Sequence, residues 1–141
     1  MHGRTALCLF IALVMATPAA AEGRTPIEMP PDVRGAFLEH MRHHMDSLDD
    51  VMAQLAAADF KGAANVAREQ LVPGSGAAFG RYLPIEFREM GLAMHRAAAD
   101  FAEVADAVPA QPTAADWKKS IEALQAISIQ CRACHSAFRL Q

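Results

Sequence analysis

Apolar side chains recur in steps of three and four along several segments of this 141-residue sequence. Residues three and four apart lie on one face of an α-helix, so this spacing predicts amphipathic helices that share a buried core. The first such segment begins near Pro31, and proline is tolerated in the first turn of a helix. Its predicted inward positions are Val33, Phe37, Met41, His44, Leu48, Val51 and Leu55.

Two further helices are predicted in the middle of the chain. Asp59 is a suitable N-cap for a helix that runs from Phe60 to about Leu71. Residues 72–84 are punctuated by Gly and Pro and therefore predict a loop. Pro84 then opens a third helix. Its predicted inward positions are Phe87, Met90, Met94, Ala97, Phe101 and Val104.

A fourth helix completes the predicted fold. Thr113 and Asp116 are spaced like a capping box, with Asp in the place of the usual Glu or Gln. No strand pattern is visible, and Ala, Leu and Met favour helices. Stripes of this kind on neighbouring helices predict an all-α, antiparallel four-helix bundle. The predicted inward positions of the fourth helix are Trp117, Ile121, Leu124, Ser128, Cys131, His135 and Phe138.

The first 21 residues have the order of a secretory signal peptide. Arg4 precedes an uncharged apolar run, and Ala19 to Ala21 form an A-x-A cleavage motif. The run is too short to suit a membrane span, which needs about 20 apolar residues. We therefore predict cleavage near Ala21, export to the periplasm and a mature domain of residues 22–141 without a membrane span. Cys8 would leave with the signal.

The sequence "CRACH" contains the two remaining cysteines, Cys131 and Cys134, followed by His135. C-x-x-C-H is the signature of covalent haem c attachment. In a helix the two thiols lie about one turn apart, within reach of one flat group, and the imidazole follows directly. A thioredoxin-like dithiol uses the same cysteine spacing, but it opens a helix in a strand–helix–strand unit that this sequence does not predict.

These features resemble the class II cytochromes c, which comprise cytochrome c′ and its low-spin, methionine-ligated relatives. "CRACHSAFRL" is similar to the C-terminal segment of that family, and "AAADFKGAANVA" is similar to its turn into the second helix. The resemblance covers residues 22–141. It implies one covalent haem c, thioether bonds to Cys131 and Cys134, and His135 as proximal iron ligand. It also implies pairing into a homodimer through the first two helices.

In that family the first helix supplies the distal side of the haem. Counting back from Phe60 brings that position close to Met41, and the apolar stripe independently places Met41 inward. Met41 is therefore the expected sixth iron ligand and His44 the second choice, although a methionine at this spacing also suits plain core packing. A His/Met pair gives low-spin iron with a raised potential.

Other histidines permit further interpretations. His40 and His44 are spaced i, i+4 and could share a copper or zinc ion. No third ligand stands near them other than Asp46 or Met41, and His43 is expected to point away. His95 is either hydrogen-bonded within the bundle or close to the haem edge. Arg42, Arg132 and Arg139 could offset haem propionates or simply be exposed.

The sequence thus predicts a periplasmic electron carrier that exchanges electrons with other redox proteins and has no enzymatic activity. The alternative is a five-coordinate haem protein that binds nitric oxide or carbon monoxide. A peroxidase would need an arginine paired with His44 on the same stripe, and none is evident. A net charge of −3 and the lack of a basic stripe argue against a nucleic-acid partner.

Overall fold

The computed structural model describes residues 23–73 and 75–141. The predicted signal peptide, residues 1–21, lies outside them. No helix in the described ranges is long and apolar enough to cross a membrane. In chain order the elements are β1 (Thr25–Ile27), α1 (Pro31–Ala56), α2 (Phe60–Gln70), η1 (Ser75–Tyr82, a 3₁₀ helix), α3 (Ile85–Asp106), α4 (Ala114–Ala137) and β2 (Phe138–Leu140).

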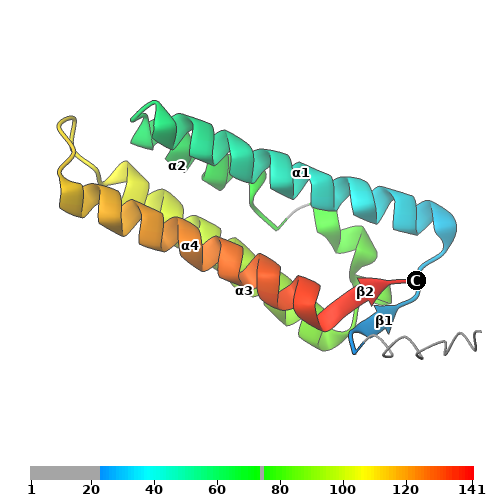
Figure 1. Ribbon diagram of the computed structural model, residues 1–141. Coiled ribbons are helices and arrows are strands. Elements are labelled where there is room, and N and C mark those ends of the chain that lie inside the picture. The colour runs from blue at the N-terminus through cyan, green and yellow to red at the C-terminus, as the bar shows by residue number, and fades with distance from the viewer. Residues whose placement is uncertain (1–22, 74) are drawn as a thin grey trace, which may run out of the picture.

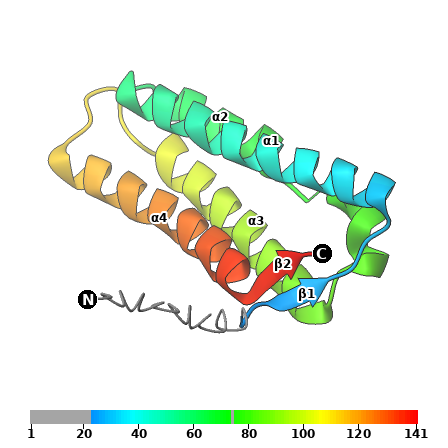
Figure 2. The same ribbon diagram turned by 45° about the vertical axis from the view of Figure 1, so that its right-hand side comes forward.

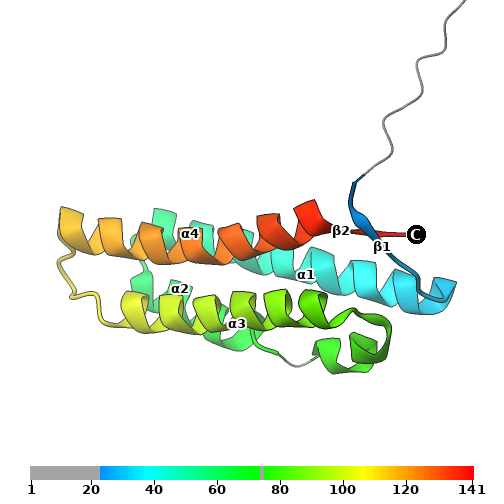
Figure 3. The same cartoon turned by 90° about the horizontal axis from the view of Figure 1, so that it is seen from below.

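Consecutive helices run in opposite directions (Figure 1). Backbone contacts join α1 to α2, α2 to α3 and α3 to α4. Seen from below, α1 and α4 lie on one side of the molecule and α2 and α3 on the other (Figure 3). The described chain is thus mostly helical, and its four α-helices are compatible with the predicted antiparallel bundle.

Proline and capping side chains mark the starts of three helices. Pro31 occupies the first turn of α1. The Asp59 carboxylate accepts a hydrogen bond from the Gly62 N–H, at 2.8 Å, and so caps α2. The predicted capping box of α4 is confirmed, because the Thr113 hydroxyl accepts from the Asp116 N–H while the Asp116 carboxylate accepts from the Thr113 N–H. These bonds satisfy N–H groups that a helix start leaves unpaired.

The short second helix divides the molecule into two ends. α1 has 26 residues and α2 has 11, so they are about 39 Å and about 16 Å long at the usual rise per residue. α2 therefore accompanies only part of α1. β1, β2 and η1 gather at the opposite end, which we call the β end (Figure 2). The other end, the α2 end, has a closed core in which Phe101 and Val51 are fully buried.

Two structural features at the β end were not predicted. β1 and β2 form a parallel pair in which Ile27 lies opposite Leu140. Such a pair joins the two ends of the described chain, and no local pattern in a three-residue strand announces it. η1 occupies most of the segment predicted as a loop, and its Phe79 is buried.

The predicted inward face of the fourth helix is partly wrong. Phe138 belongs to β2, because α4 ends at Ala137. Ile121 is 49% exposed and Ser128 is also exposed. The buried positions are Ser120 and Ile127 instead. Small residues at the true interface let helices approach closely, which an apolar stripe rule does not detect. The helix is rotated relative to the prediction, so that Cys134 as well as Cys131 faces inward.

Candidate functional site

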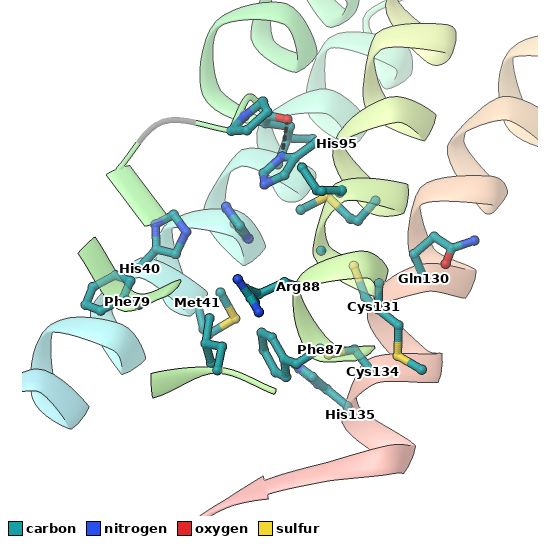
Figure 4. Close-up of a pocket in the computed structure, with 18 of the residues that line it drawn as sticks. His40, Met41, Phe79, Phe87, Arg88, His95, Gln130, Cys131, Cys134 and His135 are labelled. Carbon is teal, nitrogen blue, oxygen red and sulfur yellow. Dashed lines mark hydrogen bonds between the residues drawn. The ribbon is translucent and has the colours of Figure 1, made fainter. Parts of the chain in front are cut away.

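A cavity of about 380 Å³ opens toward the β end, where α2 no longer accompanies α1. Its walls are formed by residues 37–48 of α1, the first half of α3, the last turns of α4 and parts of the segment between α2 and α3. Most of its lining is apolar, and Figure 4 shows the side chains around it. Among them are Phe37, Leu48, Phe79, Leu83, Phe87, Met90, Met94 and Ile127.

Aromatic rings close the β end of this cavity. The Phe87 ring lies 5.4 Å from the Phe138 ring and 5.8 Å from the Phe37 ring, measured between centroids. Phe37 in turn meets Phe79 edge to face at 5.3 Å. Such contacts add to the apolar burial of each ring. The β1–β2 pair, which sequence reasoning missed, therefore supports the cavity wall from behind, because Phe138 of β2 packs against the lining residue Phe87.

Cys131 and Cys134 both line the cavity from α4. Both are free thiols and both are partly buried. Burial raises the pKa of Cys131, and it raises the pKa of Cys134 to about 11, with the Cys131 thiol as a second cause. A redox-active dithiol needs a thiolate, and hence a lowered pKa. The dithiol interpretation is therefore disfavoured.

His135 lines the same cavity from the end of α4, although its side chain is exposed. Figure 4 shows its ring directed from α4 toward the cavity, next to Phe87. Its backbone carbonyl accepts a hydrogen bond from the Arg24 guanidinium, at 3.3 Å. All three residues of the C-x-x-C-H motif thus border one apolar space.

Met41 enters the cavity from α1, on the side away from α4 (Figure 4). It is partly buried and packs against the cluster that contains Phe37 and Phe79. Its predicted inward position is confirmed, and the cavity separates its thioether from α4. Met45, one turn further along α1, also borders the cavity but is 57% exposed.

Three imidazoles form a row along the cavity, two from α1 and one from α3. The His44 ring lies 4.3 Å from the His40 ring and 5.5 Å from the His95 ring, centroid to centroid. Burial, with smaller contributions from His40, His95 and His43, lowers the pKa of His44 to about 4. Burial, followed by His95 and His43, also lowers the pKa of His40. His44 is therefore neutral near pH 7.

Hydrogen bonding distinguishes the members of this row. Nδ1 of His95 lies 2.7 Å from the Leu71 carbonyl oxygen. A carbonyl only accepts, so Nδ1 carries a proton and donates this hydrogen bond. Nε2 of His44 is buried and has no hydrogen-bond partner within the described structure. A buried nitrogen without a partner is uncommon and costs free energy, which marks His44 as a residue prepared for a ligand.

The other polar residues named from the sequence are less involved. His43 is exposed, as expected. Within the described ranges, no group of three or more His, Cys, Asp or Glu residues is arranged so that it could hold a metal ion. Arg42 pairs with Glu39 at 2.6 Å on the exposed face of α1, and Arg132 is exposed outside the cavity lining.

Sequence reasoning missed Arg88, which lines the cavity from α3. The available signal was its place between Phe87 and Gly91, which border the same space. Arg42 and Arg132 are exposed and outside the cavity lining, which agrees with the second of the two possibilities stated for them. Arg139 lies in β2 and is not among the lining residues.

These residues fit a covalently attached porphyrin. The volume of the cavity is within the range of about 300–1,000 Å³ found for organic ligand sites, which are typically apolar with a few directed polar groups. Two thiols and an imidazole are on one wall, and the thioether of Met41 and the unpartnered nitrogen of His44 are on the other. Donors on two opposite walls of an apolar space would suit the metal of a porphyrin.

Comparison with known proteins adds no independent assignment: the sequence matches no known protein family, no curated protein and no solved structure.

Proposed function

We propose that this protein is a periplasmic c-type cytochrome that carries electrons between redox proteins and has one haem c per chain. The observation that carries the proposal is the shared cavity of Cys131, Cys134 and His135, which faces Met41 across an apolar space. A C-x-x-C-H motif that pointed into solvent or into a filled core would not support it.

The cysteines would attach the cofactor and the histidine would bind its iron. Each thiol adds across one vinyl group, so that a C–S bond forms and the thiol proton passes to the neighbouring carbon. When bound, haem c supplies a one-electron Fe(II)/Fe(III) couple. The apolar cavity walls would limit the contact of the cofactor with water, and Met41 would provide a second iron ligand that raises the potential.

Two observations support alternatives at the distal position. Nε2 of His44 is buried, neutral and without a partner, so it is a competing sixth ligand. Apolar side chains such as Phe37 and Leu48 also border the cavity on the Met41 side, which favours the second function, a five-coordinate haem that binds nitric oxide or carbon monoxide. The carrier remains the first choice because two donors, rather than apolar groups alone, face His135.

The test begins with the intact mass of the full chain, expressed in cells with a working haem-attachment pathway. We expect the mass of residues 22–141 plus one haem, and the mass of the bare polypeptide for Cys131→Ser/Cys134→Ser. Absence of haem from the unmodified chain under conditions that mature a control cytochrome would reject the proposal.

Absorption spectra then separate the two functions. Six-coordinate low-spin bands, with a weak far-red methionine-to-iron band in the oxidised protein, support the carrier with Met41. A high-spin reduced spectrum that changes with carbon monoxide supports the gas-binding alternative. Low-spin bands without the far-red feature support His44.

A further inference from the structure

Among the described residues that line the cavity, Arg88 is the only lysine or arginine. Its side chain is exposed at the cavity mouth, and Figure 4 shows its guanidinium reaching from α3 toward α1. The other polar lining residues are the histidines His40, His44, His95 and His135, and Gln130. Arg88 is thus the one permanent positive charge on this surface.

No ion pair or hydrogen bond engages the Arg88 side chain within the described structure, whereas some arginines outside the cavity are paired. Arg42 bonds to Glu39 at 2.6 Å, and Arg68 contacts Asp106 at 3.4 Å. An arginine has five N–H donors in a planar fork that matches a carboxylate. A guanidinium without a partner at the mouth of an apolar cavity is therefore suited to an anionic ligand group.

We propose that Arg88 is the carboxylate-binding residue of this cavity and pairs with a propionate of the haem. This inference rests on the proposed function. A porphyrin in the cavity would bring two carboxylates, and ionised carboxylates are costly to bury away from water or a counter-charge. The exposed mouth, where Arg88 lies, offers both.

The alternative cations are less suitable. Arg42 is already engaged and faces solvent on α1. Arg132 and Arg96 are exposed outside the cavity lining. Arg24 donates to the His135 carbonyl and does not line the cavity. The geometry leaves Arg88 as the cation closest to the space that the ligand would fill.

One experiment uses the haem-loaded chain. The midpoint potential is compared for wild type, Arg88→Gln, Arg88→Lys and Arg96→Gln, at low and high salt. Loss of a positive charge near the iron favours the oxidised form, so Arg88→Gln should lower the potential, and salt should reduce the difference. Arg88→Lys keeps the charge and should stay near wild type, as should the matched control Arg96→Gln on the same helix.

A second experiment separates a propionate from any other anion. Cys131→Ser/Cys134→Ser is titrated with haemin and with haemin dimethyl ester, which lacks the carboxylates. With Arg88 present, haemin should bind about fivefold more tightly than after Arg88→Gln, the size of one exposed ion pair. The ester should bind equally to both chains.

The outcomes distinguish the inference from the proposed function. A chain that matures with haem but shows the same potential and the same haemin affinity after Arg88→Gln overturns the role of Arg88 alone. An equal loss for haemin and its ester would show that Arg88 acts by packing, which also overturns it. If Arg88→Gln does not fold, Arg88→Lys and the comparison of haemin with its ester on the unmodified Arg88 chain decide.

Discussion

Met41 and His44 are one helical turn apart on α1, and both border the cavity opposite α4. A thioether and an imidazole are both iron ligands, and they leave different potentials on the metal. Met41 packs among apolar side chains, while His44 has an unpartnered buried nitrogen and two neighbouring imidazoles. In the proposed haem protein, the sixth iron ligand would therefore be Met41 or His44. Each can be replaced without the other.

We expect Met41→Ala to convert the oxidised protein from low-spin to high-spin and to abolish the far-red methionine-to-iron band. The reason is that alanine removes the sulfur without filling its place. His44→Ala is the matched control and should keep that band. Electronic absorption of both variants is the measurement. If Met41→Ala left the spectrum unaltered while His44→Ala changed it, the sixth ligand would be His44.

For single residues, the sequence predicts which motif residues border the cavity better than it predicts the side chains around them. Cys131, Cys134, His135 and Met41 are found in one cavity because a motif and a helical period fix their positions. Arg88 was not predicted, since a single arginine beside an inward Phe87 looks like any solvated charge. The hydrogen bond from His95 Nδ1 to the Leu71 carbonyl oxygen, at 2.7 Å, connects α3 to the end of α2. Such a contact between helices cannot be predicted from the periodicity of one helix.

The turn between α1 and α2 contains a non-glycine residue in the left-handed conformation. The Asp59 N–H donates to the Gln54 carbonyl at 2.9 Å, and the Ala58 N–H donates to the Leu55 carbonyl at 2.8 Å. This is the hydrogen-bond pattern of a Schellman motif, whose left-handed position is usually glycine. Here that position is Ala58, with φ of 58°.

We expect Ala58→Gly to stabilise the protein by about 1 kcal/mol, because relief of the left-handed alanine exceeds the added flexibility of the unfolded chain. Ala57→Gly is the control one residue earlier, where φ is −81°. It should destabilise by about 0.5–1 kcal/mol. Urea unfolding of both variants measures the difference. A loss of stability in Ala58→Gly would show that this turn carries no strain.

The capping box of α4 should make stability depend on pH. Hydrogen bonds from the Thr113 side chain and backbone lower the pKa of Asp116 below 3.8. A depressed pKa means that ionised Asp116 favours the folded state, and that this contribution is lost as the pH falls from about 3.8 through the folded-state value. We expect Asp116→Asn to lower the melting temperature at pH 7, and the gap to wild type to close in acid. A gap that is constant from pH 7 to pH 2 would contradict this account.

The helices were predictable and the β end was not. The four helices follow from steps of three and four, from prolines at helix starts and from Asp59 and Thr113 as caps, all of which are local signals. The β1–β2 pair joins residues more than a hundred positions apart, from Ile27 to Leu140. η1 begins in a Gly-rich segment that also suits a loop. The buried face of α4 is centred on Ser120 and Ile127 and not on the predicted apolar stripe.

The whole molecule combines a closed end with an open one. At the α2 end, small side chains of α2 and α3 pack around Phe101, and Ala63, Ala64, Ala98 and Ala105 are buried. At the β end, α1, α3 and α4 surround the cavity. A bundle of four equal helices would fill this space with side chains. The shortness of α2 is therefore the feature of the fold that makes room for a ligand.

This division predicts unequal local stability when the ligand is removed. We expect hydrogen exchange of Cys131→Ser/Cys134→Ser, prepared without haem, to accelerate mainly in the cavity walls, residues 37–48 and 85–95. A ligand that binds only the folded cavity stabilises the segments that it contacts. Residues 98–105, packed around Phe101, should lose protection only with global unfolding. The haem-loaded wild type is the reference. Uniform acceleration along the chain would mean that the two ends form one cooperative unit, and that the cavity is held open by the bundle without help from its ligand.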